Sequence, residues 1–348
     1  MSRLWLNFCL LSFVTSVAPQ SNLSASFRNA KFEHSAKILS NSEVRTLASL
    51  SNVSHVEEVL NEICIVRVVG SLNHAKVKNY IKKIMKNLGW SLETDEFYDV
   101  TPTFGKLKFE NIITTLNPNA KRYLTLACHY DSKYSREGNF VGATDSAVPC
   151  AQLLNLATVM QKQLEPLKHA DLSLMFIFFD GEEAFDTWGP TDSIYGARHL
   201  ADKWHSVKQT YGDEDDISNL DKMDVLVLLD LIGATNPNFY NFFDSTVHWY
   251  SQLILAEKSL ADLSLLKNYF GHIPSRKYFQ PQSVNSYIED DHIPFLKKNV
   301  PILHLIPHPF PDVWHKPSDN LRNIDLTTTE NLNKILRLFV ASYFGLSV

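Results

Sequence analysis

Four compact apolar runs in this chain carry acidic or histidine residues within them or shortly after them, and helical patterns lie between them. The runs are Tyr123–Ala127, Leu172–Phe179, Val225–Leu229 and Val300–Ile306. Continuous apolar strands that alternate with helices are typical of a mostly parallel sheet covered by helices on both faces. Ligands of open sheets of this kind bind beyond the carboxyl ends of the strands. The sequence therefore predicts a three-layer α/β/α fold with a mostly parallel, mixed central sheet and a functional site at that edge.

Helices are expected where apolar residues recur at helical spacing. These segments are Asn73–Leu88, Pro149–Leu164, Ile194–Trp204, His248–Leu263 and Thr328–Phe344. Two shorter β-like runs, Trp90–Phe97 and Leu107–Thr115, precede the first compact strand. We expect Phe185–Tyr195 and Lys203–Asp224 to form long loops over the functional edge.

Composition excludes several classes of protein. The chain has 348 residues, of which 45% are hydrophobic and 20% charged, and its net charge is −5. These are ordinary globular values, and no dense stripe of Lys and Arg suggests binding to nucleic acid. The phosphate-binding glycine motifs of nucleotide enzymes and the Gly-x-Ser-x-Gly elbow of serine hydrolases are absent from the sequence. A nucleotide cofactor is therefore not expected.

The first twenty residues have the features of a secretory signal. Leu4–Val17 is mostly apolar, and the small residue Ala18 follows where a signal peptidase would cut. We expect residues 1–20 to be removed, with the cleavage point left open, and residues 21–348 to form a single catalytic α/β domain. Secretion is the predicted destination, and retention in the Golgi or elsewhere in the secretory pathway is the alternative.

Export to an oxidising compartment changes how the cysteines are interpreted. Cys128 ends a predicted strand and Cys150 begins a predicted helix, and this is the pair that we expect to form a disulfide. The alternative is that these thiols and Cys64 simply fill space in the core. Asn22 and Asn52 each begin an N-glycosylation sequon.

Two adjacent glutamates follow the strand Leu172–Phe179, in the sequence Asp180-Gly181-Glu182-Glu183. Their side chains point in different directions, so that one can bind a metal while its neighbour acts on the substrate as general acid and base. The simpler interpretation is a helix N-terminus, where the helix dipole favours acidic residues.

Asp145 and His315 are the other candidate ligands. Asp145 follows a tight Gly142 turn and could instead cap a helix. His315 lies in a proline-rich loop just after a predicted strand. Catalytic zinc commonly takes three nitrogen or oxygen ligands and leaves a fourth position open, and Asp145, Glu183 and His315 would supply them. Either acid of Asp290-Asp291 could cap a short helix or orient a neighbouring group.

Seven segments carry a more specific resemblance: Ala127–Lys133, Val141–Cys150, Ile177–Phe185, Val225–Gly233, Asp290–Phe295, Val300–Pro307 and Phe310–His315. In content and order they resemble the animal glutaminyl cyclases, or glutaminyl-peptide cyclotransferases, which are related in fold to the zinc aminopeptidases of the M28 type. The resemblance extends from about Phe32 to the C-terminus.

The resemblance implies an enzyme that cyclises N-terminal glutaminyl residues of peptides and proteins to pyroglutamate with release of ammonia. Use of N-terminal glutamyl residues stays open. It implies one Zn²⁺ per chain, and a monomer whose partners are these substrates. In the site it implies metal ligation by Asp145, Glu183 and His315, and general acid and base catalysis by Glu182. It further implies an acidic network of Asp230 and Asp290, and a substrate pocket of Trp188, Phe310 and Trp314. Finally, it implies a Cys128–Cys150 disulfide.

Two departures from the family concern the rim of that pocket. Glu289 stands where the vertebrate enzymes carry Gln, and we expect it to alter substrate contacts at the rim. The loop Tyr134–Phe140 is also shorter. The main alternative function is a two-zinc aminopeptidase of the same fold, whose additional ligand positions would be His129 and Asp230. A catalytically inactive binding protein is disfavoured because Glu182 and the three ligand positions are all present.

Overall fold

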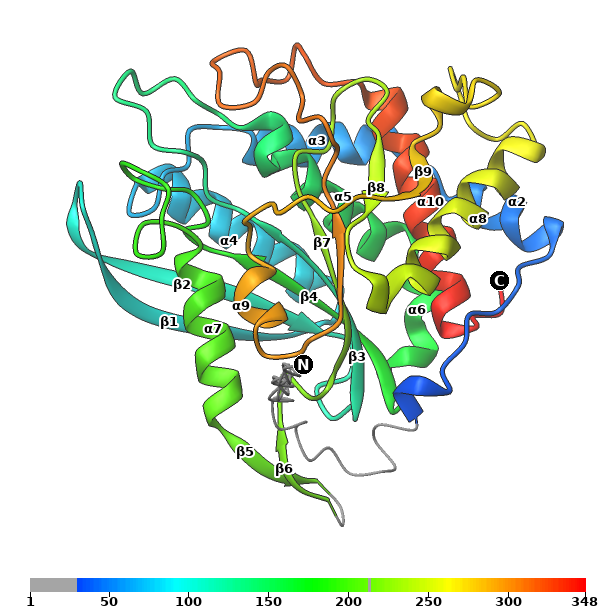
Figure 1. Cartoon of the computed structure of the whole chain (residues 1–348), viewed down its shortest axis with the longest axis horizontal. Helices are drawn as coiled ribbons and strands as arrows, with labels where there is room; N and C mark the ends of the chain where they lie inside the picture. Colours follow the sequence, from blue (N-terminus) through cyan, green and yellow to red (C-terminus); the bar gives the residue numbers. More distant parts are fainter. Residues whose placement is uncertain (1–29, 212–213) are drawn as a thin grey trace, which may run out of the picture.

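A six-stranded sheet forms the centre of the computed structural model, with the strand order β1-β2-β4-β3-β7-β10 (Figure 1). The structure describes residues 30–211 and 214–348; the expected signal segment and the sequon at Asn22 lie outside them. The strands are β1 (Ser91–Thr101), β2 (Gly105–Thr115), β3 (Arg122–His129), β4 (Leu172–Phe179), β7 (Met223–Leu229) and β10 (Ile302–Leu305). The last four are parallel, whereas β1 and β2 form an antiparallel hairpin that joins β4.

Helices cover both faces of this sheet. Alternate side chains of β4 point to opposite faces, as the two-residue repeat of a strand requires. Leu174, Phe176 and Phe178 pack in the core beneath α3 (Val53–Ile63), α4 (Leu72–Asn87), α5 (Val148–Val159), α8 (Val247–Asp262) and α10 (Leu326–Phe344). Ile177 and Phe179 pack against α7 (Tyr195–Ser206) and α9 (Ile293–Leu296). The predicted three-layer α/β/α fold with a mixed, mostly parallel sheet is confirmed.

Local sequence explains where the long helices begin. The hydroxyl of Ser71 accepts a hydrogen bond from the His74 amide at 3.1 Å and so caps α4. The carboxylate of Asp325 caps α10 by accepting from the Thr327 amide at 2.9 Å. Both caps satisfy amides that a helix leaves without an internal partner.

The prediction that Lys203–Asp224 forms a long loop over the functional edge is wrong. Helix α7 continues to Ser206, and an antiparallel hairpin of β5 (Lys208–Tyr211) and β6 (Glu214–Ser218) follows, extending away from the main sheet (Figure 1). Ile217 is buried, and mutual pairing satisfies the backbone of this polar segment. The helix expected at Pro149–Leu164 is divided, because α5 ends at Val159 and a short α6 (Gln161–Leu164) follows.

Four further elements were not anticipated. They are α2 (Asn41–Ser49), α3, and a small parallel pair of β8 (Phe239–Asn241) and β9 (Phe279–Ser283). None of the helices in the described part of the chain is long and apolar enough to cross a membrane.

Backbone hydrogen bonds hold the segment that follows β4 against the start of α7. The amides of Ile194, Tyr195 and Gly196 donate to the carbonyls of Glu182, Gly181 and Asp180 at 2.7, 2.8 and 2.9 Å. A β-carbon at Gly196 would lie 2.2 Å from Asn111 Oδ1 and 2.4 Å from the Asp180 carbonyl oxygen, so only glycine permits this approach.

Gly196→Ala should therefore lower the free energy of unfolding by about 1–3 kcal/mol, the usual cost of overpacking. Urea titration followed by circular dichroism would measure this change. Gly189→Ala is the matched control, because its new β-carbon would meet its nearest neighbour at an ordinary 3.8 Å. Equal midpoints for the two variants would contradict the close approach.

Candidate active site

The carboxyl ends of the parallel strands bring the candidate residues to one edge of the sheet. His129 ends β3, Glu182 and Glu183 lie just beyond β4, and Asp230 directly follows β7. A cavity of about 660 Å³ opens at this edge and is lined by side chains that include Glu182 and Asp230. The candidate residues that follow different strands in the sequence therefore lie together at this edge.

Asp145, Glu183 and His315 lie close enough to hold one metal ion. His315 Nε2 is 3.4 Å from Asp145 Oδ2 and 3.6 Å from Glu183 Oε2. One ligand atom from each of the three residues falls within 4.8 Å of the others. Glu183 Oε1 is buried without any hydrogen-bond partner, which is costly for a carboxylate unless a cation lies beside it. One imidazole and two carboxylates are a donor set that suits zinc.

The turn that carries Asp145 depends on Gly142 and Arg67. Gly142 has a φ of 52°, and a β-carbon there would lie 2.0 Å from the Asp145 carbonyl oxygen. Arg67 is only 1% exposed, and its guanidinium donates to the carbonyls of Tyr130 at 2.8 Å, Gly142 at 3.1 Å and Asp145 at 3.4 Å. The guanidinium thus joins the end of β3 to the Asp145 turn.

Two buried aspartates position the paired glutamates. Asp131 accepts hydrogen bonds from the amides of Glu182 at 3.1 Å and Glu183 at 3.3 Å. Asp180 accepts from the Glu110 amide at 2.7 Å and lies 2.7 Å from His74 Nε2. The backbone that carries both glutamates is therefore held from β3 on one side and from β2 and α4 on the other.

Glu182 lies in the cavity, buried beside the candidate ligands. Burial, followed by the nearby carboxylates of Glu183 and Asp290, raises the pKa of Glu182 well above its usual range, although His129 opposes the effect. A carboxyl group with a raised pKa can both accept and return a proton near neutrality.

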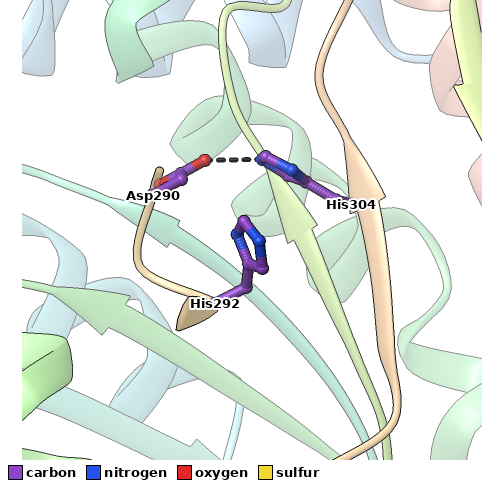
Figure 2. A group of neighbouring side chains, drawn as sticks. All are labelled: Asp290, His292 and His304. Carbon is purple, nitrogen blue, oxygen red and sulfur yellow. Dashed lines mark hydrogen bonds and ion pairs between the residues drawn. The ribbon is translucent and has the colours of Figure 1, made fainter. Parts of the chain in front are cut away.

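Asp290 pairs with His304 rather than capping α9. Figure 2 shows the Asp290 carboxylate facing the His304 ring, with Oδ2 at 2.6 Å from Nε2 and His292 beside them. Neither Asp290 nor Asp291 caps the short helix, whose first turn has no side-chain cap. Burial and the charge of Asp230 raise the pKa of Asp290 well above its usual range. Asp230 in turn accepts a short hydrogen bond from the Ser146 hydroxyl.

Aromatic side chains form the cavity wall. Trp188, Phe310 and Trp314 all line it, and the rings of Phe310 and Trp314 meet edge to face with centroids 5.0 Å apart. The Trp188 indole N–H donates to Glu289 Oε2 at 2.8 Å, so Glu289 lies at the rim as expected. These predicted pocket residues are brought together at one place.

The loop that carries Trp188 is held by Asp192. Its carboxylate accepts hydrogen bonds from the amides of Phe185, Asp186 and Thr187 at 2.9, 2.9 and 3.0 Å, and from the Tyr195 hydroxyl at 2.8 Å. Burial opposes ionisation, but these hydrogen bonds hold the pKa of Asp192 below its usual value.

The remaining predicted residues lie away from the cavity. The sulfurs of Cys128 and Cys150 are 2.8 Å apart in the core, and the structure describes both as free thiols, as it does the buried Cys64. Asn52 is exposed at the start of α3, where its side-chain oxygen accepts from the His55 amide at 3.1 Å.

Sequence reasoning missed Arg67 and Asp192, and it quoted Asp131 only as part of a motif. Each acts on backbone amides or carbonyls of distant segments. No local pattern marks such contacts, because they exist only after the chain has folded.

Comparison with known proteins adds an independent finding. Residues 111–340 match Peptidase family M28. A glutaminyl-peptide cyclotransferase of Drosophila melanogaster is 50% identical, over 99% of this chain and 98% of the relative. One from Bos taurus is 48% identical, over 90% of this chain and 88% of the relative. Among solved structures, a glutaminyl cyclase of Macrostomum lignano superimposes with a TM-score of 0.83 and 40% identity, covering 90% of this chain and 95% of that chain.

Asp192→Asn should destabilise the Trp188 loop, because an amide group cannot accept all four hydrogen bonds. The folded-state pKa of Asp192 is lowered, so its contribution is present above the pKa of an unfolded Asp and is lost as the pH falls through the folded value. We expect the variant to be less stable by about 1–3 kcal/mol at pH 7.

Urea titrations of both proteins at several pH values would measure this difference. It should shrink in acid as the wild-type carboxylate is protonated. A difference that stays constant from neutral pH to strong acid would contradict the assigned ionisation.

Proposed function

Because the chain belongs to the glutaminyl-peptide cyclotransferases of Peptidase family M28, we propose that its cavity closes N-terminal glutaminyl residues to pyroglutamyl rings with release of ammonia. The identity to curated relatives over nearly the whole chain carries this proposal. Glu182 is buried beside three side chains that could hold a metal ion, and aromatic residues line the same cavity. Such a reaction needs this arrangement.

We propose that Asp145, Glu183 and His315 hold a zinc ion. The mixed nitrogen and oxygen donors and the unpartnered Glu183 Oε1 favour this assignment. A zinc ion held there would polarise the γ-carbonyl of the substrate and stabilise negative charge on its oxygen.

One ion per chain is favoured over two. In the candidate group that shares Asp145 with the first, formed by His129, Asp145 and Asp230, the side chains already contact one another. His129 Nε2 lies 3.1 Å from Asp145 Oδ1 and 3.5 Å from Asp230 Oδ1, while its Nδ1 faces Asp131 at 3.3 Å. The Ser146 hydroxyl also donates to Asp230. A second metal would have to break these contacts, so they weigh against the two-zinc aminopeptidase.

Glu182 is proposed to move the proton. The peptide α-amine attacks the side-chain carbonyl carbon and must lose a proton, which the Glu182 carboxylate can accept. Glu182 then gives that proton to the departing nitrogen, and ammonia leaves. The attack is intramolecular, so the main task of the cavity is to fold the side chain back and hold it.

The surrounding groups hold the reacting atoms in place. Asp230 and Asp290, the latter fixed by His304 at 2.6 Å, provide acceptors near the leaving nitrogen. Trp188, Phe310 and Trp314 supply aromatic surfaces against which the glutaminyl side chain would pack. Displacement of water by a bound substrate would strengthen each polar contact inside the cavity.

The remaining proposals concern the whole chain. We propose that residues 21–348 act as one catalytic domain, as a monomer, on peptides and proteins that begin with Gln. The signal-like N-terminus favours secretion, and the exposed position of Asn52 favours glycosylation there. Gel filtration with light scattering tests the monomer, and glycosidase treatment of secreted protein tests the sugar.

Glu182→Gln should lower kcat by about 10²- to 10⁴-fold while retaining the metal, because it removes the proton acceptor but no ligand. Mass spectrometry of a Gln-initiated peptide would follow the loss of one ammonia, and elemental analysis would give the metal content. Glu183→Gln is the comparison variant and should lose both activity and metal.

Three results would contradict these assignments. Full activity of Glu182→Gln would exclude it as the proton carrier. Release of free glutamine with a shortened peptide would indicate an aminopeptidase, and two metal ions per chain would argue for the same conclusion.

We propose that Cys128 and Cys150 form a disulfide in the exported protein. Alkylation of the denatured protein should modify these two residues only after reduction, whereas Cys64 reacts without it. Cys150→Ser should lower the free energy of unfolding by about 2–4 kcal/mol, and Cys64→Ala serves as the control cysteine variant. Alkylation of Cys128 and Cys150 before reduction would exclude the bond.

A further inference from the structure

The cavity contains two charged side chains to which the proposed chemistry gives no task, Lys133 and Glu289. Lys133 faces inward, with its Nζ 3.5 Å from Glu183 Oε2, so its charge is directed to the proposed metal ligands. Glu289 is exposed at the rim. In the part of the chain that the structure describes, Glu289 accepts hydrogen bonds from two neutral groups, the Trp188 indole N–H and the Tyr287 hydroxyl. The rim therefore presents a negative charge toward solvent.

The carboxylate of Glu289 is fixed by two aromatic side chains from different segments. Its Oε2 accepts from the Trp188 indole N–H at 2.8 Å, and its Oε1 accepts from the Tyr287 hydroxyl at 3.3 Å. Trp188 belongs to the loop after β4, whereas Tyr287 and Glu289 precede α9. A carboxylate has about four acceptor positions, so Glu289 keeps the capacity to accept from a bound peptide.

The cavity is larger than one glutaminyl residue requires. Its volume is about 660 Å³, and Trp188, Tyr287 and Glu289 line it together with Glu182 and the candidate ligands Asp145 and His315. A peptide whose first residue reaches Glu182 must extend its following residues past the rim. Because Glu289 is exposed and lines the same cavity as Glu182, it is available to the side chain directly after Gln.

We propose that Glu289 is a specificity-determining residue that favours peptides with a cationic side chain immediately after the N-terminal Gln and disfavours those with an acidic one. This inference rests on the proposed cyclase function. Because the carboxylate is exposed, its effect is modest, and we expect kcat/KM for Gln-Lys peptides to exceed that for Gln-Glu peptides by about three- to tenfold at low salt. The difference should appear mainly in KM and should fall as salt is added, since the screening length is about 10 Å at 0.1 M.

The test compares three amidated pentapeptides that begin with Gln and carry Lys, Ala or Glu as the second residue, with the remainder identical. The ratio of kcat/KM for the Lys and Glu peptides is taken within each variant, so that a general change in activity cancels. Glu289→Gln keeps an oxygen that can accept from Trp188 but removes the charge, and should bring the ratio close to 1. Glu289→Lys should invert it.

Glu137→Gln is the matched control. Glu137 is exposed in the neighbouring loop and does not line the cavity, so its substitution removes one negative charge from the chain but none from the rim. It should keep the wild-type ratio. A wild-type ratio near 1 at low salt, or an unchanged ratio in Glu289→Gln, would overturn this inference while the cyclase function stands. Failure of the wild-type protein to cyclise any of the three peptides would overturn both.

Discussion

The functional edge depends on how a dense group of buried carboxylates is kept together. Asp131, Asp145, Glu182 and Glu183 all lie there with little exposure to solvent, and Asp230 and Asp290 adjoin them. Like charges at short range in a poorly polarisable interior repel strongly. His129 is placed between three of these carboxylates, and a divalent cation at the Asp145 cluster would compensate others. Burial raises the pKa values of Glu182 and Asp290, so the charged forms of both groups are disfavoured at this edge.

The same arrangement explains why one fold can host two chemistries. A cyclase and an aminopeptidase of the M28 type both need acidic residues and histidines at the ends of parallel strands. A further group of possible ligands, His129, Asp145 and Asp230, also lies at this edge. In this group the His129 imidazole and the Ser146 hydroxyl contact Asp230 directly, and Trp188, Phe310 and Trp314 line the cavity together with Glu182. The proposed one-ion site and the alternative two-ion site would therefore differ in the contacts of these side chains.

The sequence predicted the four parallel strands well because each is a buried apolar run with little alternative. Leu172–Phe179 was predicted with the boundaries that β4 has in the structure. The location of the site followed from the polar residues at the ends of these strands. The specific roles came mainly from family resemblance, since spacing alone could not separate a ligand at Asp145 from a helix cap. The β5–β6 hairpin and the contacts of Asp192 were missed because both depend on hydrogen bonds between segments, which no local sequence pattern marks.

The position of Arg67 limits how far this enzyme can be truncated from its N-terminal side. The match to the peptidase family begins at residue 111, yet the guanidinium that joins the end of β3 to the Asp145 turn comes from before that boundary. His74, which contacts Asp180 beneath the paired glutamates, also precedes it. A fragment that starts at the family boundary would retain every proposed catalytic residue but leave buried carbonyls without their donor. The smallest fragment that could be active on its own is thus longer than the segment that matches the family. Residues before position 111 support the active site by holding its backbone in place.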